Sequence, residues 1–461
     1  MSMIAAYMVP HPPMIIPEVG RGSEAQIEAT RAAYMQVAEE IAALKPDTII
    51  LSSPHATMYA DYFHISPGKE SKGSFAQFHA PQVHFQETYD EALVQAIERK
   101  AKENNFPAGT LGQREKALDH GTMVPLYFIR KKYTNFKLVR IGLSGLPLED
   151  HYRLGQIIQS AVGETERRVV YIASGDLSHK LQSYGPYGFA AEGPVYDARI
   201  MDVCSRAAFG ELFDFDETFC EHAAECGHRS FVIMAGALDG MAVEAKQLSH
   251  EDVTGVGYGI STFHPKGANE NRHFLAIRHR SEEKRLTEAR NHSDAWVRLA
   301  RESVESYVLH HQVMNVPNDL PEELLNRKAG AFVSIHKQGR LRGCIGTIAP
   351  TRANLAEEII RNAVSAAFND PRFNPIQPEE LKWLEINVDV LSEPEDIPSE
   401  DDLDIKRYGV IVTRGQRRGL LLPDLDGVDT VQQQVAIARK KAGIGPDEKV
   451  SLQRFEVVRH T

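Results

Sequence analysis

The chain has 461 residues, 42% of them apolar and 25% charged, a balance typical of a soluble globular protein of two or three domains. Its formal net charge of -11 argues against nucleic acid or an anionic membrane surface as the main partner. The sequence has no apolar run of the about 20 residues that a membrane span needs and no signal-peptide pattern at its start. Four cysteines, none arranged as CxxC, are too few for a disulfide framework, so we expect a cytoplasmic protein.

Residues 1–264 alternate between short apolar runs and helical patterns, which predicts an α/β domain with a mostly parallel sheet covered by helices. A helix is expected over Ser23–Leu44, with Ser23 as its N-cap. Buried strands are expected at 3–9, 47–53, 137–143 and 168–174, and a last, glycine-rich strand near 255–264.

Residues 265–292 are rich in charge and turn formers, and we interpret them as a linker that is helical in part. The segment 293–461 combines several strands with a few helices, which predicts an α+β domain. Its helices are expected over 294–309 and 354–368, and its strands at 329–336, 384–392, 408–414 and 418–425.

Four histidines of residues 1–264 lie at the ends of expected strands or helices. His11, His55 and His179 each follow a strand, and His120 lies in a tight turn ahead of a helix. Because ligands of open α/β sheets bind outside the carboxyl ends of the strands, we expect these side chains to converge. Two imidazoles and a carboxylate form the iron site of non-haem Fe(II) oxygenases, and a further histidine can act as acid or base.

A simpler alternative exists for each of these residues. A single histidine after a strand is more often a hydrogen-bonded structural residue, and only the combination of four favours a metal site. His64, His79, His84 and His151 lie in polar segments and are expected at the surface.

The third metal ligand should be anionic, and the sequence AlaAlaGluCysGlyHisArgSer offers two candidates side by side. Glu225 is a hard ligand suited to Fe(II), whereas Cys226 is a soft ligand that favours zinc or Cu(I). Glu225 equally fits a solvated carboxylate in the first turn of a helix. We expect His228 and Arg229 to contact substrate, with Arg229 holding an anion.

The motifs ValProHisProPro, SerProHis, LeuAspHisGly and SerGlyAspLeuSerHis resemble those of class III extradiol dioxygenase catalytic subunits and of the related Memo proteins, over about residues 3–262. The resemblance implies that His11 and His55 bind the metal and that His120 and His179 are catalytic. It implies Glu225 as third ligand if the chain follows the dioxygenases, and Cys226 if it follows the Memo proteins. It further implies Fe(II), with zinc as the alternative, and a small aromatic substrate with O₂.

A second pair of motifs, LeuArgGlyCysIleGlyThr at 341–347 and AlaPheAsnAspProArgPhe at 367–373, lies in the C-terminal segment. Cys344 is a candidate nucleophile, metal ligand or plain buried thiol. The residues that we expect to line one cleft are Arg342, Cys344, Asn369, Asp370 and Arg372.

These motifs resemble the AMME chromosomal region family over about 293–461, which implies a fold but no reaction. Proteins of this kind occur with Memo-like domains and radical-SAM enzymes as the AmmeMemoRadiSam system, so the resemblance implies a radical-SAM enzyme as partner.

Three functions remain open from the sequence. The leading one is a non-haem Fe(II) oxidoreductase that cleaves a phenolic or catechol-type ring. The second is a metal-binding accessory or maturation protein without oxygenase activity. The third is a metal-dependent hydrolase in which His179 is the base for a metal-bound hydroxide. The substrate and a homo-oligomeric state are left open.

Overall fold

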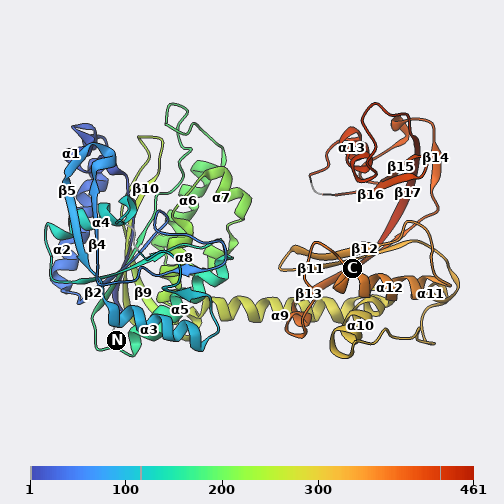
Figure 1. The fold of residues 1–461 in the computed structure, drawn as a ribbon, viewed down its shortest axis with the longest axis horizontal. Helices are drawn as coiled ribbons and strands as arrows, with labels where there is room; N and C mark the ends of the chain where they lie inside the picture. Colours follow the sequence, from blue (N-terminus) through green and yellow to red (C-terminus); the bar gives the residue numbers. More distant parts are fainter. Residues whose placement is uncertain (1–2, 115–116, 426) are drawn as a thin grey trace. The chain divides into compact units, whose positions relative to one another are not determined.

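The computed structural model describes residues 3–114, 117–425 and 427–461. The chain divides into two compact units, Met1–Arg278 and His279–Thr461 (Figure 1). Within the described ranges, no helix combines the length and apolar character needed to cross a membrane.

The first unit is built on a six-stranded sheet with the order β7-β2-β8-β1-β10-β9. Strands β1, β2, β7 and β8 are mutually parallel, whereas β10 runs antiparallel to β1 and to β9. The predicted α/β fold is confirmed, with an antiparallel edge added to the parallel strands. The bounds are β1 Met3–Val9, β2 Thr48–Ser53, β7 Lys137–Gly142, β8 Val169–Ser174, β9 Met241–Glu251 and β10 Tyr258–Ala268.

Both faces of this sheet are buried, because successive side chains of β1 enter two different cores. Ala6 and Met8 belong to one core and Tyr7 and Val9 to the other. Helices α2 and α4 cover the second core, and helices α3, α5, α6 and α8 cover the first. The bounds are α1 Pro17–Gly20, α2 Glu28–Leu44, α3 Glu91–Glu103, α4 His120–Arg130, α5 Leu148–Gly163, α6 Glu192–Ser205, α7 Glu217–Ala223 and α8 His228–Ala237.

Three features of the first unit differ from the sequence-based expectations. A hairpin of β4 (Glu70–Phe75) and β5 (Ala80–Thr88) was not predicted, and neither was the pair β3 (Phe63–His64) and β6 (Ala108–Gly109). The predicted cap Ser23 is wrong, because its hydroxyl donates to Gly20 O and a 3₁₀ turn precedes α2.

The expected linker range, 265–292, contains the end of β10, a short 3₁₀ turn and the helix α9, Phe274–His292. The boundary between the two units, after Arg278, lies inside this helix.

The second unit is an antiparallel sheet with the order β12-β11-β13-β17-β15-β16, in which β14 also pairs with β17. Helices α10 and α12 pack on one part of it, and α13 packs on β15 and β16. The predicted α+β fold is confirmed. The bounds are α10 Ala295–His310, α11 Glu322–Asn326, β11 Ala331–Lys337, β12 Arg340–Gly346, α12 Leu355–Phe368, β13 Leu384–Leu391, β14 Glu395–Ile397, β15 Tyr408–Arg414, β16 Arg417–Leu421, α13 Val431–Lys441 and β17 Ser451–His460.

Candidate metal centre

The carboxyl ends of β1, β2 and β8 bring three loops of the first unit together. His11 follows β1 and is buried, and its backbone N–H donates to Asp176 Oδ1 at 2.7 Å in the loop after β8. His55 follows β2, and its Nε2 lies 3.0 Å from Nε2 of His11. The convergence expected from the parallel strands is therefore present for His11 and His55.

Cys226 completes a set of three donors with these histidines. Its Sγ lies 3.6 Å from His11 Nε2, and the donor atoms of His11, His55 and Cys226 all lie within 4.8 Å of one another. Tetrahedral zinc, with bonds of about 2.0–2.1 Å to nitrogen and about 2.3 Å to sulfur, would set two nitrogens about 3.3 Å apart and a nitrogen and sulfur about 3.6 Å apart. These side chains therefore fit one metal ion by donor chemistry and by spacing.

The hydrogen bonds of His11 fix which ring nitrogen faces the donor set. Ser174 Oγ donates to Gly121 O at 2.6 Å and lies 3.0 Å from His11 Nδ1. Because the serine proton is given to Gly121, the contact requires that His11 Nδ1–H donates to Ser174. Nε2 then carries the lone pair toward His55 and Cys226, which is the tautomer that a metal ligand needs.

Burial favours the neutral form of both imidazoles. It lowers the pKa of His11 well below its usual range and also lowers the pKa of His55. Burial raises the pKa of the Cys226 thiol well above its usual range. A coordinated thiol is deprotonated, so metal binding at this site would release the Cys226 proton.

His120 lies beside the donor set at the start of α4. Its ring centroid is 4.0 Å from that of His55 and 5.4 Å from that of His11. The preceding residue, Asp119, caps α4 by accepting the Thr122 N–H at 3.0 Å. Burial and the neighbouring histidines lower the pKa of His120 to about 3, so its ring is neutral.

Asp176 and His179, both in the loop after β8, form a second group with Cys226. Asp176 Oδ2 lies 3.9 Å from His11 Nε2 and 3.9 Å from His179 Nε2, and burial raises the pKa of this carboxyl to about 6. Tyr187 stacks on His179 with centroids 5.1 Å apart. Sequence reasoning missed Asp176, although it lies in the motif GlyAspLeuSerHis that singled out His179.

Two glycines allow the loop after β8 to lie directly against the start of α8. A Cβ on Gly175 would come within 2.1 Å of Gly227 Cα, so neither position has room for a side chain. This contact sets the Asp176 N–H 3.3 Å from Cys226 Sγ and lets the Gly227 N–H donate to Asp176 O at 3.1 Å. The thiol is thereby held beside His11.

The remaining residues proposed near position 225 have other contacts. Glu225 accepts the His228 N–H at 2.6 Å, and burial raises its pKa to about 7. His228 is buried, with Nε2 2.9 Å from Leu212 O, and Arg229 donates to Glu217 at 3.1 Å. Among the described residues, none of these three belongs to the two donor groups or to the pocket lining.

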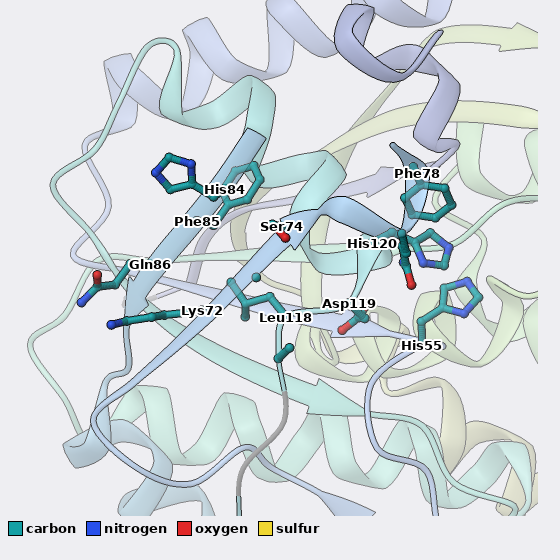
Figure 2. A pocket seen from close by; sticks show the side chains of 13 residues that line it. His55, Lys72, Ser74, Phe78, His84, Phe85, Gln86, Leu118, Asp119 and His120 are labelled. Carbon is teal, nitrogen blue, oxygen red and sulfur yellow. The ribbon is translucent and has the colours of Figure 1, made fainter. Parts of the chain in front are cut away.

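A pocket of about 900 Å³ adjoins the donor set (Figure 2). His55, Asp119 and His120 line one end of it, and Lys72, His84 and Gln86 of the β4–β5 hairpin lie at the other end. Sequence reasoning missed this wall because the hairpin was not predicted. The complete lining is His55, Lys72, Gly73, Ser74, Gln77, Phe78, His84, Phe85, Gln86, Ala117, Leu118, Asp119 and His120.

Two of the histidines expected at the surface are buried, so that expectation was wrong for them. His64 Nε2 lies 2.9 Å from Gln113 O, and His151 Nδ1 lies 3.0 Å from Pro147 O. A backbone carbonyl therefore accepts a hydrogen bond from one nitrogen of each buried ring.

In the second unit, the residues expected to line a cleft bind one another and the chain around them. Asp370 accepts the Cys344 N–H at 3.0 Å, and Arg372 donates to Cys344 O at 3.2 Å and to Asp370. Arg342 donates to both carboxylate oxygens of Glu380. These contacts tie the edge strand β12 to the segment after α12.

The thiol of Cys344 and the side chain of Asn369 complete this set. Ser334 Oγ donates to Cys344 Sγ at 3.3 Å from the neighbouring strand, and Asn369 is exposed at the end of α12. Arg342, Cys344, Asp370 and Arg372 therefore hold β12 in place, whereas Asn369 does not take part in these contacts.

Comparison with known proteins extends this description. A family model described as the catalytic LigB subunit of aromatic ring-opening dioxygenase matches residues 5–261, and the AMMECR1 model matches residues 297–460. The chain belongs to the LigB family. Its second unit is an AMMECR1 domain, and the Memo-like and AMMECR1 fusion expected from the sequence is supported.

Protein CA_C1420 of Clostridium acetobutylicum has the same two-domain extent, with 40% identity over 100% of this chain and 99% of its own length. A Thermotoga maritima protein is 52% identical over 36% of this chain and 96% of its own length.

Two solved structures are also similar. Uncharacterized protein PH0010 from Pyrococcus horikoshii is 34% identical and covers 36% of this chain and 88% of its own, with a TM-score of 0.34. Uncharacterized protein JW3007 from Escherichia coli K12 is 15% identical and covers 56% and 99%, with a TM-score of 0.40.

Proposed function

We propose that the first unit of this LigB-family chain is a metal-dependent oxidoreductase that opens the ring of an aromatic diol with O₂. The observation that carries the proposal is the convergence of His11, His55 and Cys226 beside a pocket that His55 itself lines. We propose these three residues as the metal ligands and Fe(II) as the metal. A bound Fe(II) would supply redox and Lewis-acid chemistry to the diol and to O₂.

The residues around the donor set have separate proposed tasks. His179, whose pKa burial lowers, has a ring that is neutral near pH 7 and can take a proton from a diol hydroxyl. His120 lines the pocket and offers its neutral ring as a hydrogen-bond partner for a substrate oxygen. Asp176, 3.9 Å from His179, favours the protonated imidazole once the proton has moved.

Oxygen consumption tests this proposal. The full chain is reconstituted with Fe(II) without oxygen, its iron content is measured, and O₂ uptake is followed with a panel of catechols. Uptake with at least one diol, abolished in His11→Gln and retained in the exposed-histidine control His222→Gln, is the expected result. Iron-loaded protein that turns over no diol contradicts the oxygenase proposal.

A second candidate is a metal-binding accessory protein without oxygenase activity, acting with a radical-SAM enzyme. The thiol of Cys226 favours it, because two imidazoles and one thiolate also suit zinc. This candidate predicts stoichiometric zinc in the protein as isolated from cells and no O₂ uptake with any diol after iron loading.

A further inference from the structure

We propose that the substrate joins its diol ring to a distant anionic group, which Lys72 recognises at the outer end of the pocket, the end away from His55 and His120. The inference rests on the proposed function, because that function places the ring beside His55. It adds the size and the charge of the substrate and one specificity-determining residue, Lys72.

The volume of the pocket is the first support. At about 900 Å³ it lies near the upper end of the roughly 300–1,000 Å³ typical of sites for drug-sized ligands. A single dihydroxylated ring beside His55 would leave most of this space to water. A substrate that buries most of its surface here therefore extends beyond one ring.

Side chains of the hairpin strands β4 and β5 would contact the part of the substrate that extends beyond the ring. Lys72 pairs with Gln86 and Ser74 pairs with His84, so these four side chains stand on the same face of the two strands. All four line the pocket, and Figure 2 shows Lys72, His84 and Gln86 away from His55 and His120. Near His120, the ring of Phe78 offers an apolar wall, with its centroid 5.5 Å from that of the histidine.

The charges of the lining residues favour an anionic group at the outer end of the pocket. The one carboxylate among the lining residues, Asp119, already accepts hydrogen bonds from Ser53 and Thr122 and lies 4.0 Å from Arg140 Nη1. Glu70 lies outside the lining, where it accepts from Gln86 at 2.8 Å and sits 3.7 Å from Lys72 Nζ. The cation that lines this end is the Lys72 ammonium, and an anionic extension would compete with Glu70 for it. His84 Nδ1 donates to Gln82 O at 3.0 Å, so its ring is a polar neighbour of Lys72 and not a second free donor.

Calorimetric binding of three probes to the full chain tests this inference. The probes are chlorogenic acid, in which a catechol is joined through an ester to a distant carboxylate, its neutral methyl ester, and catechol. They are titrated without oxygen into protein of measured metal content. Because Lys72 is 66% exposed, we expect chlorogenic acid to bind about fivefold more tightly than its methyl ester, the size of a favourable exposed ion pair.

Two lysine variants assign that difference. Lys72→Gln should reduce the difference in affinity between acid and ester to less than about twofold. Lys69→Gln changes an exposed lysine outside the lining and should retain the difference. Salt at about 1 M should weaken the difference in the unchanged protein. Equal binding of acid and ester to the unchanged protein, or a difference that survives Lys72→Gln, overturns the inference. Metal content and O₂ uptake report on the proposed function separately, since the acid–ester comparison needs no turnover.

Discussion

The thiol sulfur of Cys226 lies 3.6 Å from Nε2 of His11, whereas the carboxylate of the preceding residue, Glu225, accepts a backbone hydrogen bond from His228. We therefore expect Cys226→Ala to lower metal affinity at least about tenfold, because one of the three proposed ligands is lost. Glu225→Gln keeps a hydrogen-bond acceptor and should retain the metal. Metal analysis after dialysis measures both, and loss of metal from Glu225→Gln alone would reverse the assignment.

Arg140 carries a charge in the buried middle of β7, under the loop that holds His120. Its guanidinium donates to Ser66 Oγ and to Ala117 O and faces Asp119. Arg140→Met leaves the buried Asp119 carboxylate without its cation, which should cost about 3–5 kcal/mol of unfolding free energy. Urea unfolding followed by circular dichroism measures this loss.

The matched control for Arg140 is an exposed arginine of the same unit. Arg31 pairs with Glu28 on the surface of α2, so Arg31→Met should cost less than about 1 kcal/mol. Similar losses in the two variants would show that the buried charge has no special role.

Stability of the second unit should fall in acid because of Glu380. Burial raises the pKa of this carboxyl, but hydrogen bonds from Arg342, the Gln377 N–H and Lys337 outweigh burial and lower it to about 2. Since the carboxyl is more acidic in the folded state, its contribution is complete above about pH 5 and is lost as pH falls toward 2. The contribution is on the order of 2 kcal/mol.

Tryptophan emission measures this effect selectively. Both tryptophans of the chain, Trp296 and Trp383, lie in the second unit. Glu380→Gln should flatten the dependence of the unfolding free energy on pH between 5 and 2, and Glu379→Gln, at an exposed neighbour, should not. An unchanged pH profile in Glu380→Gln would contradict the prediction.

Asp370 covers the edge of β12 by accepting the Cys344 N–H. Asp370→Ala leaves this donor without its acceptor and removes the carboxylate partner of Arg372, so we expect a loss of about 1–3 kcal/mol of unfolding free energy. An uncovered strand edge also promotes pairing between molecules. Tryptophan-detected unfolding and sedimentation velocity check the two effects, and a variant as stable and as monodisperse as the unchanged chain would refute both.

The sequence predicted the parallel strands and the meeting of His11 with His55, because apolar runs and the rule for carboxyl strand ends depend only on local pattern. Local sequence pattern could not decide whether Glu225 or Cys226 lies beside His11. Ala224 adopts a left-handed backbone, with φ of 55°, and the direction in which the chain leaves this turn decides which neighbour faces His11.

The hairpin wall and the buried histidines escaped prediction for a different reason. Strand β4, with the sequence GluSerLysGlySerPhe, is polar and partly exposed, so it lacks the apolar period of a strand. His64 and His151 lie in polar sequence, yet both are buried. The carbonyl of Gln113, distant in the sequence, accepts a hydrogen bond from His64, and the carbonyl of Pro147, four residues earlier, accepts one from His151. Such partners are defined only by the folded chain.

The close approach of Gly175 and Gly227 means that the position of the Cys226 sulfur is set by two residues that have no side chain and supply none of the three donor atoms. Alanine at either position would push two backbone segments apart and carry the thiol away from the imidazoles, although every donor atom would still be present in the chain. Saturation mutagenesis aimed only at polar residues would overlook this control. A metal-poor variant can therefore retain His11, His55 and Cys226 unchanged.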